Sequence, residues 1–156
     1  MTRYHIAQIN VARLREPLES AANAGFVSRL EEINAIADRA PGFVWRLQTP
    51  EGDATYLRPF DDDQIIVNMS VWESVEALEK FVWQTVHTRF YTRKHEWFEK
   101  LDGAYFVLWH VPAGHRPSVE EAIARLDHLK AHGPSEHAFG WQDAAAAKLW
   151  RSARCA

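Results

Sequence analysis

The stretch that decides the fold is VWESVEALEKFVWQTVHTRFYTRKHEWFEKL, which runs from Val71 to Leu101. Its first residues are typical of the end of a strand, and Ser74 follows as the N-cap of a helix that can continue to Leu101. Aromatic residues fall on more than one side of that helix, whereas an ordinary surface helix has one apolar stripe. This composition indicates a pocket wall, or a helix covered by another chain.

The segments around this stretch alternate between the two-residue period of strands and the 3.6-residue period of helices. Their order is β-α-β-β-α-β followed by further helices, which is the ferredoxin-like pattern. We therefore expect an α+β fold with a four-stranded antiparallel sheet, in one domain over residues 1–141 with a tail over residues 142–156. The expected strands are Tyr4–Leu14, Phe43–Thr49, Ile65–Trp72 and Ala104–Val111, and the expected helices are Glu19–Ala40, Val75–Leu101, Val119–His132 and a short one at Asp143–Trp150.

Two dimensions argue against one straight helix over Val75–Leu101. That helix would be about 40 Å long, whereas an eight-residue strand spans only about 26 Å. We expect a bend or break within His87–Thr92, where two threonines are weak helix formers.

Bulky apolar side chains occupy both faces of the expected sheet. Two helices can cover only one face, so the other face predicts a homodimer that joins through its sheets. The expected groupings are Phe43, Trp45 and Leu47 on one side of their strand, Ile65, Val67, Met69 and Val71 opposite Ile66 and Trp72, and Tyr105, Val107, Trp109 and Val111 opposite Phe106 and Leu108.

The composition is that of an ordinary globular domain, with 156 residues, 47% hydrophobic and 25% charged. A net charge of −3 gives no basic surplus, so we expect no nucleic-acid partner. The single cysteine, Cys155, excludes an internal disulfide. There is no signal-peptide pattern and no apolar run of the roughly 20 residues that a bilayer requires, so we expect a cytoplasmic protein that does not bind membranes.

Several short motifs together suggest a family. They are an AQ-x-N opening (Ala7, Gln8, Asn10), VWES at residues 71–74, a spaced set (His87, Phe90, Arg93, Glu96, Trp97, Phe98), VLWHVPAGHRPSVEEA at residues 107–122 and HGPSEHAFGW at residues 132–141. Over roughly Tyr4–Trp141 the chain resembles the bacterial domain-of-unknown-function family numbered 3291.

This resemblance implies membership of the dimeric α/β-barrel superfamily, whose members share a ferredoxin-like half-barrel. Relatives there include cofactor-free antibiotic-biosynthesis monooxygenases, haem-binding or haem-degrading enzymes, haem-dependent peroxidases, muconolactone isomerases and stress proteins without an agreed activity. A fold of this kind hosts many functions, so the function has to be argued from the site.

His87 is the leading candidate for chemistry. It lies at the expected helix break, four residues after Trp83 and three before Phe90. A histidine in an aromatic pocket can act as a general base or ligate haem iron. The structural alternative is a half-buried histidine that is hydrogen-bonded to a backbone carbonyl near the kink.

Two further groups could hold a substrate anion. Arg93 shares one helical side with Arg89 and Glu96, which is typical of an anion clamp or of a surface ion-pair ladder. Asn68, on the third expected strand, is the neutral candidate for the same task. His110 lies near the end of the last expected strand, and residues at strand ends often line pockets.

Seven tryptophans are many for a chain of this length. Trp72, Trp83, Trp97 and Trp109 can line a site for a planar substrate, and core packing or dimer burial explains them as well. His128 and His132 lie one helical turn apart, with His137 following. No carboxylate or cysteine completes a known metal pattern there, so we expect no metal site.

Three functions stay open. The favoured one is a monooxygenase-like oxidoreductase that acts without a cofactor on a small aromatic or quinol-type molecule. His87 would be its base, Arg93 or Asn68 would hold the anion, and the tryptophans would form the walls. The second is a haem-binding protein with His87 as axial ligand, and the third is a non-enzymatic small-molecule-binding or stress-associated dimer.

Overall fold

The computed structural model describes residues 3–15, 24–47, 65–84, 98–99 and 106–143 of the chain. The strands are β1 (Tyr4–Leu14), β2 (Phe43–Arg46), β3 (Ile65–Trp72), β4 (Phe98–Glu99) and β5 (Phe106–Pro112). The helices are α1 (Ala24–Arg39), α2 (Val75–Phe81), α4 (Val119–His132) and the 3-10 helix η3 (Trp141–Asp143).

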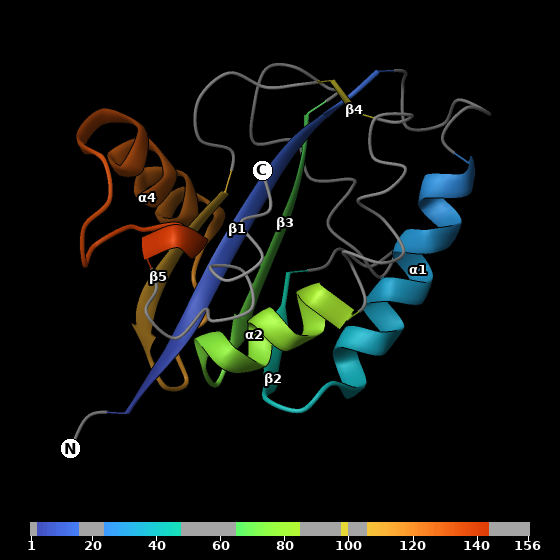
Figure 1. Cartoon of the computed structure of the whole chain (residues 1–156), viewed down its shortest axis with the longest axis horizontal. Coiled ribbons are helices and arrows are strands. Elements are labelled where there is room, and N and C mark those ends of the chain that lie inside the picture. The colour runs from blue at the N-terminus through green and yellow to red at the C-terminus, as the bar shows by residue number, and fades with distance from the viewer. Residues whose placement is uncertain (1–2, 16–23, 48–64, 85–97, 100–105, 144–156) are drawn as a thin grey trace.

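β1 is the central strand of one antiparallel sheet (Figure 1). It pairs with β3 along one side and with β5 along the other, and β2 pairs with the outer side of β3. The resulting order β2-β3-β1-β5 confirms the ferredoxin-like α+β prediction. The short β4 pairs with the far end of β1, at Arg13 and Leu14.

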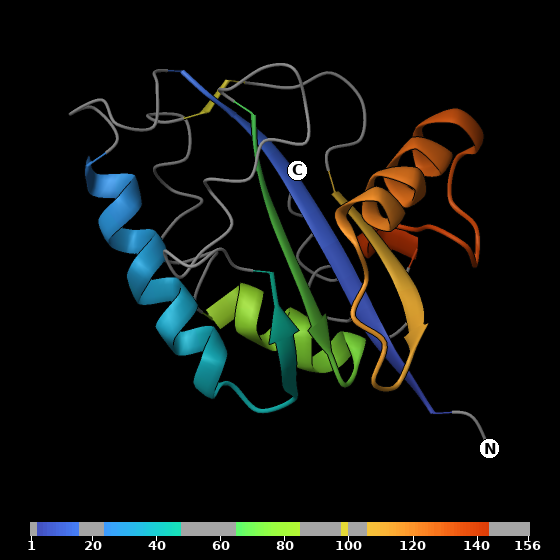
Figure 2. The ribbon, with the colours of Figure 1, turned by 180° about the vertical axis from the view of Figure 1, so that it is seen from behind.

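Successive side chains of a strand point to opposite faces, so the sheet has two faces of different composition. The face that we call the α4 face carries Ala7, Ile9, Val67, Met69, Val107 and Trp109, which pack against Ala122 and Leu126 of α4. The opposite face, here the α2 face, carries Ile6, Trp72 and Leu108, which pack with Ala37 of α1 and Leu78 of α2. Figures 1 and 2 show α2 and α4 on opposite sides of the sheet.

Because α4 covers the second face of the sheet, that face gives no argument for a homodimer. We expected one sheet face to lack cover within the chain, but α4 packs on that face. Ile9, Met69, Val107 and Trp109 are fully buried within the single chain. The dimer therefore stays a prediction, without support from an uncovered face.

Two predictions of local structure were wrong. The helix expected over Val75–Leu101 ends at Phe81, a π-helical turn follows at residues 82–84, and the chain is extended in β4. The break expected within His87–Thr92 lies outside the described residues. A register shift between Phe43 and Trp45 breaks the alternation of β2. Because of this bulge, Phe43 packs on the α2 face whereas Trp45 and Leu47 pack on the α4 face.

Other expectations lie partly outside the described residues. The helix expected from Glu19 is described only from Ala24, and its Ile33 and Ala37 are buried. The tail helix expected at Asp143–Trp150 has only its first residue, in η3, within the described part. In that described part, no helix is both long enough and apolar enough to cross a bilayer.

Ser118 caps α4, because its Oγ accepts a hydrogen bond from the backbone N–H of Glu121 at 3.1 Å. The Glu121 side chain does not complete a capping box. Its two oxygens accept instead from Trp109 Nε1 at 2.9 Å and bond His115 Nε2 at 2.7 Å. This carboxylate joins the start of α4 to the middle of β5.

We predict that Glu121→Ala destabilises the fold by about 1–3 kcal/mol, because the buried Trp109 N–H loses its acceptor. Burial raises the pKa of Glu121, but the hydrogen bonds from His115 and Trp109 outweigh it, and the pKa lies below its ordinary value. The stabilisation is therefore complete above the ordinary glutamate pKa and is lost as the pH falls through the folded value.

Urea unfolding at neutral pH and at pH values below 4.5 measures both effects. Glu121→Gln is the matched variant, since it keeps an acceptor for Trp109 and loses the charge. An equal loss of stability in wild type and Glu121→Gln on acidification would contradict the assignment to this carboxylate.

Candidate functional site

Polar side chains interrupt the apolar α2 face at its centre. Gln8 of β1 lies opposite Ser70 of β3, and in the next row Asn10 lies opposite Asn68. Gln8 is only 5% exposed and Ser70 only 7%. Buried polar groups are the exception in a sheet core, so this polar row is the feature of the face that calls for a functional explanation.

Gln8, Asn68 and Ser70 form one connected hydrogen-bond network with Trp72. Gln8 Nε2 donates to Asn68 Oδ1 at 2.9 Å and to Ser70 Oγ at 2.8 Å. Trp72 Nε1 donates to the same Ser70 Oγ at 2.9 Å. Three residues of β3 and one of β1 are thereby held in fixed orientations, and Asn68 stands at the exposed end.

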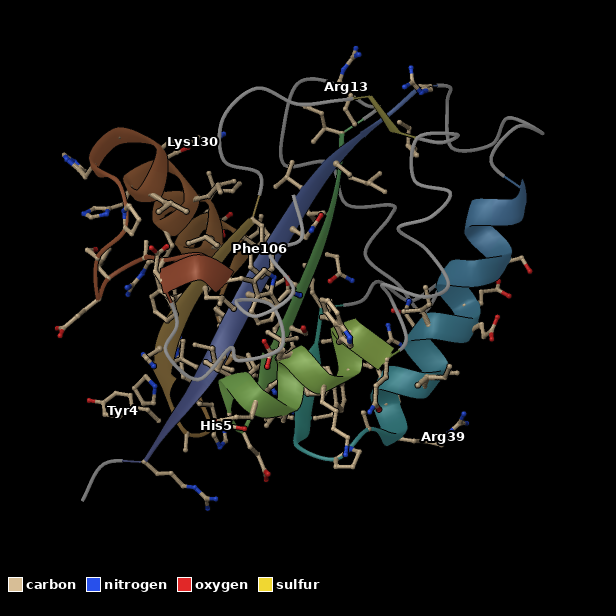
Figure 3. All side chains as sticks on the ribbon, viewed as in Figure 1. Tyr4, His5, Arg13, Arg39, Phe106 and Lys130 are labelled. Atoms are coloured by element: carbon tan, nitrogen blue, oxygen red, sulfur yellow. The ribbon has the colours of Figure 1, made fainter. Side chains whose placement is uncertain are left out.

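Aromatic rings enclose this network on two sides. Trp72 is 1% exposed, stacks on Phe81 of α2 at 5.0 Å between ring centroids, and meets Phe43 edge-on at 5.4 Å. At the β5 side, Phe106 stacks on Trp141 at 5.3 Å. Phe106 is labelled in Figure 3, between the sheet and the chain that follows α4. It lies opposite Asn10 and so borders the polar row.

The position of α2 over this face depends on Gly42. A Cβ at that position would lie 2.5 Å from the Ala77 side chain, and its φ of +84° also favours glycine. The Gly42 carbonyl accepts from the backbone N–H of Glu73 at 2.8 Å. The turn before β2 is thereby joined to the start of α2, which brings Phe81 onto Trp72.

Arg46 extends the polar row to β2, where it lies opposite Ser70. Its Nε donates to Asp38 Oδ1 of α1 at 2.8 Å, and its Nη2 to Asp38 Oδ2 at 3.3 Å. The side chain is only 12% exposed, so this bidentate pair fastens α1 over the edge of the site.

The structure brings together part of the predicted site. Asn68 and Trp72 belong to the polar network. His110 lies on the same face, and its ring centroid is 5.5 Å from that of Phe139. Trp83 lies half-buried in the π-helical turn after α2. The predicted residues that lie outside the described part of the chain are His87, Phe90, Arg93 and Trp97.

Trp109 is separated from the other predicted wall residues. It is one residue away from Leu108 and His110, so the alternation of β5 turns it to the α4 face. Its indole N–H is bonded to Glu121 there. Trp109 is therefore a core residue that holds α4, and we remove it from the candidate site.

The sequence interpretation missed Gln8 and Ser70 as site residues. Both residues lie in segments that the sequence analysis considered. Gln8 is part of the AQ-x-N motif, and Ser70 lies between apolar neighbours of its strand. A polar residue at a position whose strand neighbours are buried is the signal that could have found them. Their partnership spans 62 residues of sequence, which no local pattern reveals.

The segment after α4, residues 134–143, forms what we call the strap. Its Phe139 pairs with Leu108, with backbone N–O distances of 2.7 and 3.0 Å. Ala138 joins the cluster of the α4 face, while Phe139 and Trp141 join that of the α2 face. The strap thus passes around the edge of β5 and supplies Trp141 to the site.

Cationic and imidazole groups fasten the strap to α4. Arg125 Nη1 lies 3.0 Å from His137 Nδ1 and donates to the His137 carbonyl at 2.8 Å. His128 lies between His132 and His137, with ring centroids 4.7 and 4.5 Å away. The pKa of His137 is lowered by desolvation, then by the charge of Arg125 and by His128. Among the described residues, no group of histidine, cysteine or acidic side chains is arranged to hold a metal.

We predict that the strap loosens in acid. A folded pKa below the ordinary value means that the neutral imidazole of His137 stabilises the fold above about pH 6.5, and that this stabilisation is lost as the pH falls. The protection factor of the Phe139 amide against hydrogen exchange should drop between pH 7.5 and 5.5, while that of Ile9 in β1 should not. A drop of the same size in His137→Gln would contradict this origin.

We also predict that the two buried tryptophans differ in role. Trp109→Phe should lower stability by about 1–3 kcal/mol through the lost bond to Glu121 and leave the affinity for a ligand of the α2 face unchanged. Trp72→Phe should weaken that affinity, because Ser70 loses a donor that fixes its orientation. Urea unfolding and ligand titration of both variants measure the contrast, and equal effects on affinity would contradict it.

The family model described as Domain of unknown function (DUF3291) matches residues 5–155. The chain belongs to this family. No curated protein matches the chain.

Solved structures with a similar arrangement include three bacterial proteins. SnoaB, a cofactor-independent oxygenase from Streptomyces nogalater, is 21% identical with a TM-score of 0.45, over 75% of this chain and 98% of SnoaB. PA3566 from Pseudomonas aeruginosa is 13% identical with a TM-score of 0.46, over 73% and 95% of the two chains. NE2512 from Nitrosomonas europaea, a protein of unknown function, is 8% identical with a TM-score of 0.47, over 74% and 97%. Because these sequence identities and TM-scores are low, we base the fold assignment on the strand order of this DUF3291 member alone.

Proposed function

We propose that this DUF3291 member is a monooxygenase-like oxidoreductase for a small aromatic or quinol-type molecule, which it binds on the α2 face. The observation that carries this proposal is the buried network of Gln8, Ser70 and Trp72, which has aromatic rings on two sides and ends at the exposed Asn68. An enclosure of this kind suits a planar ring that bears a polar oxygen.

The enclosure supplies two requirements of such a reaction, which are exclusion of water and a hydrogen-bonding group for an oxygen of the substrate. The rings of Trp72, Phe81 and Phe106 exclude water from one side of the ligand. The Asn68 amide offers a neutral hydrogen-bonding group for an oxygen that becomes an enolate or phenolate when the substrate loses a proton. His87, the base that the sequence predicts, lies outside the described residues.

The proposed reaction balances without a further reductant. The base removes a proton from an activated ring CH2, which a hydroxylated ring presents in its keto tautomer, and the resulting carbanion–enolate transfers electrons to molecular oxygen. One oxygen atom becomes a carbonyl on that carbon, and the other leaves as water with the two hydrogens that the carbon has lost. The substrate is thus oxidised and dioxygen is reduced.

The two alternatives make different demands on the chain. Haem binding requires His87 as axial ligand, and nothing in the described residues favours it. A non-enzymatic binding protein requires only the aromatic enclosure and no consumption of oxygen. The first experiment is therefore an absorbance spectrum of protein expressed with haem precursor, in which a Soret band lost in His87→Ala would replace our proposal by haem chemistry.

We predict oxygen consumption when the colourless protein is mixed with a series of hydroquinones and hydroxylated polycyclic ketones. Asn68→Ala should lower kcat/KM roughly 100-fold, as the loss of one preorganised donor to an oxyanion does. His87→Ala should abolish uptake and retain binding. Asp127→Asn, on the exposed side of α4, is the control and should keep the wild-type rate. Wild-type protein that binds these molecules without oxygen uptake would contradict the oxygenase and leave the binding protein.

A further inference from the structure

The hydrogen-bond network of the α2 face has a direction, which the Gln8 amide sets by donating to two oxygens. An indole N–H can only donate, so Ser70 Oγ must accept from it. Gln8 Nε2 uses its two hydrogens on Ser70 Oγ and on Asn68 Oδ1. Both lone pairs of the Ser70 hydroxyl are thereby occupied, and its own hydrogen is left to donate.

The same direction determines which end of the Asn68 amide is presented. Its oxygen is held by Gln8, and the amide is planar, so Nδ2 points away from Gln8 with two N–H groups. Among the described residues, none accepts a hydrogen bond from that nitrogen. Asn68 is the exposed member of the network, so these donors can reach a ligand.

The geometry points to Gln8 as a positioning residue that makes this site selective for a hydrogen-bond-accepting oxygen, carbonyl or aryloxide, over a hydroxyl that has to donate. Gln8 acts through Asn68 and does not itself touch the ligand. This inference rests on the proposed function only for the place of the ligand, against Asn68. If the Gln8 amide were reversed, its oxygen would hold Asn68 Nδ2, and the site would present the Asn68 oxygen and favour donors.

Because the inference concerns the polarity of binding, it can be tested without turnover. The probe is 4-nitrophenol, whose phenol and phenolate forms differ in colour, with 4-nitroanisole as a neutral analogue that cannot ionise. Wild-type protein should bind the phenolate roughly tenfold more tightly than the phenol, the gain expected for a hydrogen bond to a charged acceptor. The absorbance titration of bound probe against pH then shifts to lower pH than that of free probe.

Three variants separate positioning from structure. Gln8→Met keeps the length of the side chain and releases the Asn68 amide, so the phenolate preference should fall below about twofold while 4-nitroanisole still binds. Asn68→Asp keeps the acceptor for Gln8 and replaces the donors by a carboxylate, so the preference should reverse toward the phenol. Ser118→Asp adds the same charge at the N-cap of α4, on the opposite face, and should keep the wild-type preference.

The outcomes are distinguishable. If Gln8→Met keeps the phenolate preference, or if wild-type protein prefers the phenol, the inference is overturned. If Gln8→Met does not fold, Gln8→Glu provides the same test, because a carboxylate cannot donate to Asn68 Oδ1, and an unchanged preference there overturns the inference too. If wild-type protein binds neither probe, the site itself is wrong. If it binds with the expected preference but consumes no oxygen with quinols, the inference stands and only the oxygenase proposal fails.

Discussion

The rest of the structure depends on the alternation of side chains along β1, the strand that pairs on both sides. Because adjacent residues must point to opposite faces, Ala7 and Ile9 supply the core beneath α4, and Ile6 and Gln8 supply the face beneath α1 and α2. A slip of one residue in the pairing of β1 would exchange these two sets. Gln8 would then lie against the apolar side of α4, away from its partners Asn68 and Ser70 on β3.

Elements governed by local patterns could be predicted from the sequence. The bounds expected for the first strand, the third strand and the helix over Val119–His132 coincide with those of β1, β3 and α4. Apolar–polar alternation and the Ser118 cap are local signals, and they suffice for such elements. The end of α2 at Phe81 was not predicted, because the aromatic and apolar pattern of the sequence continues past that residue. The bulge of β2 was not predicted, because it is a shift in the pairing with β3, which no pattern within β2 reveals. The side of the sheet on which α4 packs is likewise a choice made between elements distant in sequence.

The candidate site was predictable in part for the same reason. Asn68 and Trp72 are conspicuous residue types on a strand whose register is unambiguous, and both were named. Gln8 and Ser70 gain their meaning only when β1 and β3 are paired, since the network joins residues about 60 positions apart. Trp109 shows the opposite error, because residue type suggested a ligand wall whereas its strand parity assigns it to the core.

The strap also bears on strand pairing between molecules. A strand at the edge of a sheet exposes backbone N–H and C=O groups that can recruit a strand from another molecule. Phe139 occupies the middle of the β5 edge by pairing with Leu108 in both directions, and the chain curls over that edge to both faces. The strap therefore blocks edge-to-edge growth at β5, and the same ten residues that complete an aromatic enclosure also protect the fold against aggregation.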